Sequence, residues 1–572
     1  MTNPLIGGLV AATILLSACG ASQSATSRPA ASASTTPAQS TTLVMVINQE
    51  VKNLSAKAYG GVNPARTTRV FNAGLAIADA RGEFRPYLAE GLPQLQTESW
   101  QVFPDGRMET TWTLRPGLTW HDGSPLTADD FVFANQVYSA PGLAGVFVPT
   151  PQNLIDRITA VDPRTIRISW RTSYLHQGEG LDPLPRAILG ESFAAFEQDP
   201  AGQRDPFMSQ RYWTTEFVGV GPFKLTHWEP GAQLEGTAFD GHALGRPKID
   251  KIVLRIITDG NTVLAALLAG QVHMVVTDVI GIEEANTLKG QGGFNDVDKK
   301  GVIIPTSTAI ITLDIQHRPE FLGTPAIADL RVRKALAHSL DKAGIIEGLY
   351  QGLGSVADTF VRREAPFFPD VDRAITKYPF DPTKTEQFMN SAGFVKDREG
   401  FFVDAAGQRF QPSVIYSLGP QREQLLPIMV NSWQSVGIDV QGTLVPNPIR
   451  NDPELNATFA GGVVHGNGMT SEVGGAQSLV SDQIGTAANH WSGNNRGGWT
   501  NPDYDSWWDR YNKTVVRADQ IEALTQMMKI QSELLPSYPL YYLLSVVPHV
   551  AALKGPQGDA SHWNIYEWEL AG

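Results

Sequence analysis

Residues 114–130 read LRPGLTWHDGSPLTADD, and they combine three local signals in one short stretch. The overlapping residues 108–115 alternate between apolar and polar side chains, which predicts a strand with one exposed face. The Asp-Gly pair at 122–123 predicts a tight turn, because glycine tolerates a positive φ angle. Thr127 with Asp130 is a variant capping box and predicts the start of a helix. The stretch therefore predicts a strand, a turn and a capped helix in succession.

The same stretch contains His121 beside Asp122, a pair that invites comparison with a metal site or an acid–base pair. Neighbouring side chains on an extended strand point in opposite directions, and no further ligand is adjacent in the sequence. We therefore predict a structural role for His121.

Other segments supply strands of a second kind and further helices. Residues 43–47 form an uninterrupted apolar run, which is typical of a strand buried on both faces. Residues 155–161 and 165–170 flank an Asp-Pro-Arg turn and predict an antiparallel hairpin. A helix is predicted from Asp519. The pattern indicates a large mixed α/β protein.

A further helix is predicted from Asp329 onward. Its apolar residues recur at helical spacing, so one face is expected to be buried and the basic residues between them to point outward. The expected buried residues are Val332, Leu336, Leu340 and Ala343, and the expected outward residues are Arg331, Arg333 and Lys334.

Composition narrows the classes of partner. The 572 residues include 45 Lys and Arg against 58 Asp and Glu, for a formal net charge of −13. This is the wrong sign for a protein that binds the phosphate backbone, so no nucleic-acid partner is expected. The single cysteine excludes an intrachain disulfide, a four-cysteine zinc site and a cysteine-ligated iron–sulfur cluster.

The cysteine lies at the end of an apolar N-terminal run. Residues 4–18 carry no charge and are too few for a membrane span, so residues 1–18 are predicted to be a secretory signal peptide. Leu16-Ser17-Ala18-Cys19 resembles the lipobox of bacterial lipoproteins. This implies that Cys19 carries lipid and anchors an exported protein, on the cell surface or in the periplasm. Residues 19–42 have the composition of a flexible tether.

Several segments resemble one protein family in the order in which that family carries them. They are LRPGLTWHDGSPLTADD at 114–130, GVGPF at 219–223, VLAALLAGQVHMV at 263–275, DLRVRKALAHSLDKAGI at 329–345, VGIDV at 436–440 and NPDYD at 501–505. Together they resemble the extracellular solute-binding proteins of family 5, which serve ABC importers of peptides, nickel complexes and some oligosaccharides.

The resemblance implies an α/β, two-lobed periplasmic-binding-protein fold of the large, peptide-binding type, with a subdomain inserted in the first lobe. Two crossings of the chain, near 308–314 and 534–541, would form the hinge. The implied parts are lobe 1 at 43–82, 216–307 and 537–572, the inserted subdomain at 83–215, and lobe 2 at 308–536.

The implied function is that of the substrate-binding component of an ABC importer. A small solute, with a peptide or peptide-like ligand preferred, would be captured between the lobes and delivered to a permease, while a separate subunit hydrolyses ATP. The chain has no GxxxxGK[ST] phosphate loop, in agreement with that division. A monomer without cofactor or metal is expected.

The resemblance also implies where ligand would bind. Peptide-binding relatives hold the ligand's amino group with an aspartate in a Gly-Trp-x-x-Asp-like stretch, but residues 461–468 here read GGVVHGNG. A free peptide N-terminus therefore lacks its expected anchor in that stretch. The predicted ligand-binding residues are Tyr59 and Asn63 from the first lobe, and Arg422, His465, Asn467, Trp491, Asn494 and Trp499 from the second.

Several alternatives remain open at this point. The same clamp suits an oligosaccharide or a nickel chelate, and a lipoprotein sensor would keep the clamp but signal to a receptor. An enzyme that processes glycosides or peptides is the less favoured class, because the chain has no HExxH motif, no GxSxG motif and no cysteine nucleophile.

Overall fold

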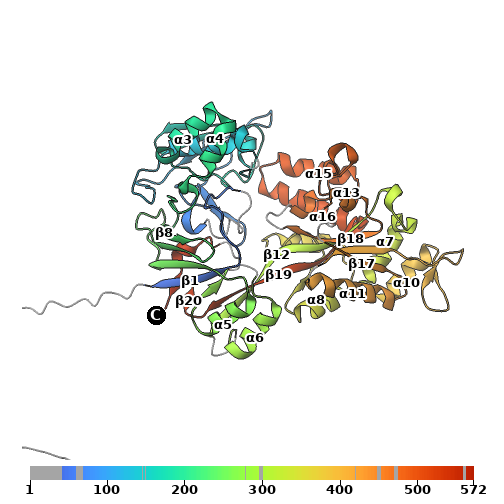
Figure 1. The fold of residues 1–572 in the computed structure, drawn as a ribbon. Helices are drawn as coiled ribbons and strands as arrows, with labels where there is room; N and C mark the ends of the chain where they lie inside the picture. The colour runs from blue at the N-terminus through green and yellow to red at the C-terminus, as the bar shows by residue number, and fades with distance from the viewer. Residues whose placement is uncertain are drawn as a thin grey trace, which may run out of the picture. The chain divides into compact units, whose positions relative to one another are not determined.

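Figure 1 shows the protein as a computed structural model, in which Thr41–Gly572 form one compact unit. The predicted signal peptide, nearly all of the tether and Cys19 lie outside the described residues, as do Tyr59 and Asn63. In the described part of the chain, no helix combines the length and apolar character needed to cross a membrane. The structure describes residues 41–58, 69–144, 146–148, 150–276, 279–295, 300–418, 420–446, 452–468, 474–557 and 562–571.

The largest sheet among the described residues has eleven strands and mixes parallel with antiparallel pairs. The predicted buried strand at 43–47 lies inside it and pairs in parallel with a neighbour on each side. In spatial order the strands are β17 (Gln441–Val445), β16 (Ser413–Ser417), β18 (Gly462–Gly468), β12 (Gly301–Ile315), β19 (Ser537–Val550), β11 (Met274–Val275), β1 (Thr42–Ile47), β10 (Lys251–Ile256), β9 (Gln233–Ala238) and β8 (Phe223–Glu229), with β13 (Ser355–Val356) beside β19.

Strands β12 and β19 are the longest in this sheet and pair antiparallel along most of their length (Figure 1). At one end, Val547 of β19 is buried in a hydrophobic cluster around β1 and β8–β10, which we call the first core. At the other end, Leu313 of β12 and Leu540 of β19 are buried in a separate cluster, which we call the second core. One strand pair therefore belongs to two cores, which is the architecture of a two-lobed protein.

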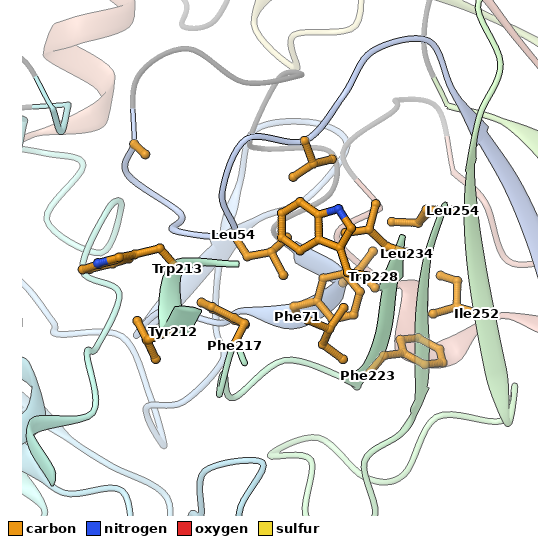
Figure 2. Close-up of a cluster of buried hydrophobic side chains, with 14 of the residues drawn as sticks. Leu54, Phe71, Tyr212, Trp213, Phe217, Phe223, Trp228, Leu234, Ile252 and Leu254 are labelled. Carbon is orange, nitrogen blue, oxygen red and sulfur yellow. The ribbon is translucent and has the colours of Figure 1, made fainter. Parts of the chain in front are cut away.

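The first core is rich in aromatic side chains (Figure 2). Phe71 and Phe223 are fully buried, and Trp228 lies beside them. The helical turn that ends at Phe71 is held against the sheet, because Gly221 donates its backbone N–H to the Phe71 carbonyl at 2.9 Å. Two short strands, β20 (Leu553–Lys554) and β21 (Glu569–Leu570), contribute to this core. The other elements of this half pack in separate hydrophobic clusters: α5 (Gly260–Leu268) and α6 (Ile282–Gly292) in one, and β2 (Ala76–Ala78) and β3 (Phe84–Pro86) in another.

A four-stranded antiparallel sheet and three helices follow β3 in the chain. The predicted hairpin is confirmed, because 155–162 pairs with 165–170. The predicted alternation is confirmed as well, since Met108, Thr110 and Trp112 are buried on one face. The elements are β4 (Trp100–Val102), β5 (Met108–Thr113), β7 (Thr165–Trp170) and β6 (Ile155–Asp162) in spatial order, with α2 (Ala128–Ser139), α3 (Arg186–Gln198) and α4 (Pro200–Met208).

The turn between β5 and α2 forms as the sequence predicts. Gly123 has a φ angle of +88°. The backbone N–H of Thr127 donates to Oδ2 of Asp130 at 2.9 Å, which completes the acidic half of the capping box. His121 is buried and accepts the Gly219 N–H at Nδ1 (3.2 Å), while its Nε2 lies 2.9 Å from the Gly221 carbonyl. Both ring nitrogens are therefore used to hold the 219–221 loop, and the structural role predicted for His121 is confirmed.

The second core is surrounded by helices, and here two predictions are wrong, one on the length of a helix and one on the position of Arg333. The helix predicted from Asp329 ends at His338, a new helix begins after Asp341, and Ala343 is exposed on it. Arg333, expected to point outward, is 7% exposed. The helices of this half are α7 (Leu330–His338), α8 (Lys342–Tyr350), α9 (Phe368–Ala374), α10 (Pro382–Ser391), α11 (Pro420–Ser435), α13 (Pro453–Thr458), α14 (Gly474–Gln477), α15 (Pro502–Lys513) and α16 (Arg517–Leu534), with a hairpin of β14 (Val395–Lys396) and β15 (Phe402–Val403).

The burial of Arg333 has a physical reason that the helical pattern does not contain. Its guanidinium donates to the carbonyls of Ile327 at 3.0 Å, Ala328 at 2.7 Å and Leu534 at 3.2 Å. Ile327 and Ala328 belong to the short turn before α7, and Leu534 is the last residue of α16. Carbonyls at the end of a helix have no donor left within the helix. Arg333 therefore joins α7 to the end of α16, directly before β19.

Candidate functional site

A cavity of about 320 Å³ opens beside the first core, between the segment that follows β1, strand β2 and residues 174–182. Unlike the hydrophobic clusters around it, this cavity is lined by groups of both charges. Its polar and charged side chains are Lys57, Arg69, Asn72, Thr150, Tyr174, Glu179 and Asp182. We call it the charged cavity.

Lys57 is the most enclosed cation of the charged cavity, with only 4% of its surface exposed. Its Nζ donates to the Thr150 carbonyl at 2.6 Å and lies 5.7 Å from the centre of the Tyr138 ring. Burial lowers the pKa of Lys57 to about 8, and the carboxylates of Asp182 and Glu179 oppose that shift. The ammonium group therefore remains charged at neutral pH, but water solvates it poorly.

Asp182 is the corresponding anion. Burial raises the pKa of Asp182, while the positive charges of Lys57 and Arg69 act in the opposite direction. Nε of Arg69 is buried and has no hydrogen-bond partner among the described residues. An ionic group in a protein interior is stabilised by an opposite charge and by hydrogen bonds, and these groups have that stabilisation only in part. The cavity can therefore accept a solute that carries both a carboxylate and an ammonium group.

The backbone of the cavity wall leaves room for Lys57 only because residue 180 is glycine. Gly180 has a φ angle of +68°, and a Cβ atom there would lie 2.9 Å from Cδ of Pro151 and 3.2 Å from Nζ of Lys57. A side chain at this position would be strained and would displace the ammonium group. The glycine thus keeps the cation where it meets the cavity.

The segment predicted to present Tyr59 and Asn63 is continuous with this cavity in the chain. Both residues lie outside the described residues, but Lys57 lies two positions before Tyr59, and Arg69 lies six positions after Asn63. Both flanking residues line the charged cavity. The two ligand contacts stay predictions.

Of the second-lobe residues, Arg422 lies on α11 near the end of β16. Its Nη1 donates to Oγ of Ser417 at 2.7 Å and to the Leu418 carbonyl at 3.2 Å, and its guanidinium lies 5.6 Å from the centre of the Tyr416 ring. His465 and Asn467 belong to β18 and face Thr312 and Ile310 of β12 in the backbone register. Their side chains lie outside the described part of the structure.

The three remaining predicted residues are spread over the 483–499 loop. Trp491 is half-buried and lines a separate cavity of about 230 Å³ together with Arg496. Asn494 is exposed. Trp499 is 7% exposed and packs edge-on against Tyr504 at 5.4 Å between ring centres. The structure does not bring these three side chains to the charged cavity, and their contact with ligand stays a prediction.

Sequence reasoning missed Lys57, Arg69 and Asp182, the groups that charge the cavity. They are far apart in the chain, so no motif or spacing rule joins them. The one local signal is an isolated lysine between Ala56 and Ala58, a small and apolar setting in which a cation is unusual. Within the described residues there is no group of three or more His, Cys, Asp or Glu side chains placed to hold a metal ion.

Comparison with known proteins places this geometry in context. The model of the family described as bacterial extracellular solute-binding proteins, family 5 Middle, matches residues 92–471. The chain is 26% identical over 458 residues to heme-binding protein A of Haemophilus influenzae, with 75% of each chain covered. It is 24% identical over 388 residues to oligopeptide-binding protein AppA of Bacillus subtilis, covering 65% of this chain and 63% of that one.

The fold has a solved counterpart. The structure of HbpA2 from Haemophilus parasuis superposes with a TM-score of 0.72 at 19% identity, covering 93% of this chain and 100% of that one. The two-lobed α/β fold predicted from the sequence is confirmed.

Proposed function

This chain belongs to the bacterial extracellular solute-binding proteins of family 5, and we propose that it is the substrate-binding component of an ABC importer. The observation that carries the proposal is the match to that family over residues 92–471. The described architecture supports it, because one strand pair, β12 and β19, joins two hydrophobic cores. A protein built in this way can close around a solute and deliver it to a permease without chemical change.

The boundaries of the proposed lobes are placed where the β12–β19 pair passes from one core to the other. The pairing of β12 with β19 shifts register between Ser307 and Ala309 and again between Ile311 and Thr312. Such irregularities bend a strand and interrupt its ladder, so they support a hinge at 308–314. We propose lobe 1 at 43–82, 216–307 and 537–572, the inserted subdomain at 83–215, and lobe 2 at 308–536.

The charged cavity suggests the class of solute. A free peptide is a zwitterion, with an ammonium group at one end and a carboxylate at the other. Asp182 and Glu179 suit the ammonium group, and Lys57 and Arg69 suit the carboxylate through charge-assisted hydrogen bonds. A peptide or peptide-like zwitterion is therefore the proposed ligand, with Tyr59, Asn63 and Arg422 as further contacts.

The test uses residues 41–572, which form a compact unit. A library of free tripeptides and the same library with acetylated N-termini and amidated C-termini are compared by thermal shift and native mass spectrometry. We expect only the free library to raise the melting temperature. Equal shifts, or none with either library, would refute the zwitterion assignment. Scattering curves that stay unchanged with a bound ligand would refute closure.

Two variants separate the two ends of the ligand. Asp182→Asn should weaken peptides with a free amino group and leave N-acetylated peptides unchanged. Lys57→Met should weaken peptides with a free carboxylate and leave C-amidated peptides unchanged. A loss of roughly 10-fold to 100-fold is expected for each, because hydrogen bonds to charged groups contribute about 1.5–3 kcal/mol.

The anchoring of the protein is a separate part of the proposal. We propose that the protein is a monomer. We also propose that it is exported and held to the membrane by lipid on Cys19, and this part is supported by the sequence of the N-terminal segment alone. Metabolic labelling with a radioactive fatty acid should mark the wild-type protein and leave Cys19→Ala unlabelled. Label on both proteins, or on neither, would remove this part of the proposal without touching solute binding.

A further inference from the structure

The cavity of about 230 Å³ that Trp491 and Arg496 line belongs entirely to the second half of the chain. It lies between α13 and the loop that precedes α15, and it shares no lining residue with the charged cavity. Its volume is below the roughly 300–1,000 Å³ that sites for drug-sized ligands have, so it suits a molecule with a single ring. We call it the loop cavity.

A neighbouring arginine holds the walls of the loop cavity in place. Nη1 of Arg318 donates to the Ala457 carbonyl at 2.6 Å and to the Arg496 carbonyl at 2.7 Å. Its Nη2 donates to the Gly485 carbonyl at 2.9 Å. All three acceptors belong to residues that line the cavity. The cavity is therefore built into a fixed arrangement of α13 and the loop.

Arg496, in contrast, makes no hydrogen bond or ion pair through its side chain within the described part of the chain. The residue is half-buried, and its Nη1 is enclosed by the protein, so the surface that it still exposes belongs to its other atoms. Burial lowers the pKa of Arg496, and the carboxylate of Asp314 opposes that shift. A buried cation that lacks acceptors is costly, and its attraction for an anion extends beyond direct contact. An anion in the loop cavity would therefore be stabilised.

The acidic residues nearby leave this positive charge in place. Among the described residues, no Asp or Glu lines the cavity. Asp452 accepts the backbone N–H groups of Glu454 at 2.8 Å and Leu455 at 3.2 Å, so it caps α13. The side chain of Glu454 is exposed. Glu320 acts on Arg318, where its negative charge opposes the lowering of the pKa by burial. The described wall thus carries a net positive charge, from Arg496.

Trp491 supplies a ring at a strained backbone position. It has a φ angle of +58° and follows His490 at +55°, a left-handed conformation that is uncommon for residues other than glycine. Such strain persists only where the surroundings hold it, and it clusters at binding sites. Gly485 is part of these surroundings, because a Cβ atom there would lie 2.8 Å from the Trp491 carbonyl oxygen. The loop therefore keeps an indole in the cavity wall at a cost in backbone energy.

The remaining polar side chains decide what kind of ring fits. Asn456 and Ser492 place an amide and a hydroxyl group in the same wall, and both groups can donate and accept hydrogen bonds. A pyranose ring has C–H groups on one face, which pack on an indole, and hydroxyl groups around its edge, which bond to an amide or a hydroxyl. A plain aromatic acid has no such hydroxyl groups.

We propose that the loop cavity binds a sugar acid, a pyranose ring that carries a carboxylate. The carboxylate pairs with the guanidinium of Arg496, the C–H face of the ring lies on Trp491, and the ring hydroxyls bond to Asn456 and Ser492. This inference goes beyond the proposed function, because the site lies within the proposed second lobe and takes a different ligand from the charged cavity. It does not depend on the assignment of a peptide ligand.

The test titrates residues 41–572 with D-glucuronate, D-glucose and benzoate, and follows binding by ligand-observed NMR. Glucuronate and glucose share the pyranose ring, but only glucuronate has a carboxylate, whereas benzoate has the carboxylate without the hydroxyl groups. We expect D-glucuronate to bind at least about tenfold more tightly than either of the others. No binding of D-glucuronate to the wild type, or equal binding of the three probes, would overturn the proposal.

Three variants test the location. Arg496→Met should weaken D-glucuronate by roughly 10-fold to 100-fold and leave D-glucose unchanged, because the variant loses a charged hydrogen bond to the carboxylate. Trp491→Gly suits the positive φ angle and should weaken both sugars by roughly threefold to tenfold. Arg398→Met removes an exposed positive charge elsewhere in the second lobe and should change neither. Equal losses of D-glucuronate binding in Arg398→Met and Arg496→Met would contradict the assignment.

Thermal unfolding separates a binding role of Arg496 from a structural one. The side chain gives no hydrogen bond to the described protein, so Arg496→Met should keep the melting temperature or raise it. A lower melting temperature together with unchanged D-glucuronate binding would make Arg496 a structural residue and overturn the proposal. The tripeptide libraries report on the charged cavity alone, so failure of one test leaves the other intact.

Discussion

The histidine of the strand–turn–helix stretch should make the protein sensitive to acid. His121 is 4% exposed, and both its ring nitrogens are used by the 219–221 loop. Since Nδ1 accepts the Gly219 N–H, the neutral ring carries its proton on Nε2 and donates it to the Gly221 carbonyl. Protonation of Nδ1 would break the first of these bonds. We therefore expect the folded protein to resist protonation of His121.

The size of the effect follows from the pKa. Burial lowers the pKa of His121 from 6.5 to about 4, so between these values the unfolded chain binds a proton that the folded protein does not. The contribution of His121 to the free energy of unfolding is therefore fully present above pH 6.5, and it falls as the pH decreases toward 4. The total loss from this one group is roughly 3 kcal/mol, or about 1.4 kcal/mol per pH unit.

The assay is urea denaturation of residues 41–572, followed by tryptophan fluorescence at several pH values between 4 and 7. His121→Asn should be about 1–3 kcal/mol less stable at neutral pH, because the Gly221 carbonyl loses its donor. Its stability should fall less steeply in acid, so the two proteins converge. Other buried histidines contribute equally to both proteins and cancel in the difference. His227→Asn, at an exposed position, is the control. Parallel curves for His121→Asn and wild type would refute the reasoning.

Three further changes test other parts of the structure. Arg333→Met should lower the free energy of unfolding by at least about 3 kcal/mol, because three backbone carbonyls lose a charged donor, whereas Lys334→Met on the same helix should change it by less than about 0.5 kcal/mol; equal losses in urea titrations would contradict this. Gly221→Ala places a Cβ atom 2.3 Å from a neighbouring backbone carbon and should prevent folding, while Gly91→Ala, with open space around it, should not, as circular dichroism would show. Any carboxylate ligand held by Lys57 should bind more weakly as pH rises through about 8, by up to roughly tenfold per pH unit, and calorimetry on Lys57→Met should show no such dependence.

The local elements of this fold were predictable from the sequence because their signals are local. The alternation at 108–113, the hairpin at 155–170 and the contact of Thr127 with Asp130 each depend on residues a few positions apart. The helix predicted from Asp519 is also present, but it begins at Arg517. The two-lobed arrangement came from the resemblance to a family, since no local pattern reveals that β12 and β19 join two cores.

The errors have two causes, one local and one distant. Val332 and Leu336 are buried as predicted, yet a continuous helix would have carried the stripe to Ala343. Asp341 instead accepts the Gly344 N–H at 2.9 Å and caps a new helix. The helical pattern places Arg333 on the surface. It is buried because it donates to the Leu534 carbonyl at the end of α16, some two hundred positions later in the chain. The charged cavity was missed for the same reason, because only the fold brings Lys57 to Asp182.

The placement of charge in the cavity has a consequence for how closure would be driven. Lys57, Arg69 and Asp182 all line one cavity beside the first core, so a solute can meet them before the lobes close. Contacts that are equally strong in the open and closed forms raise affinity but do not shift the balance between them. The free energy that closes the protein must then come from groups that reach the solute only in the closed form. In our proposal this group is Arg422, from the second lobe. Affinity and closure would therefore respond to different substitutions, the first to changes at Lys57 and the second to changes in the second lobe.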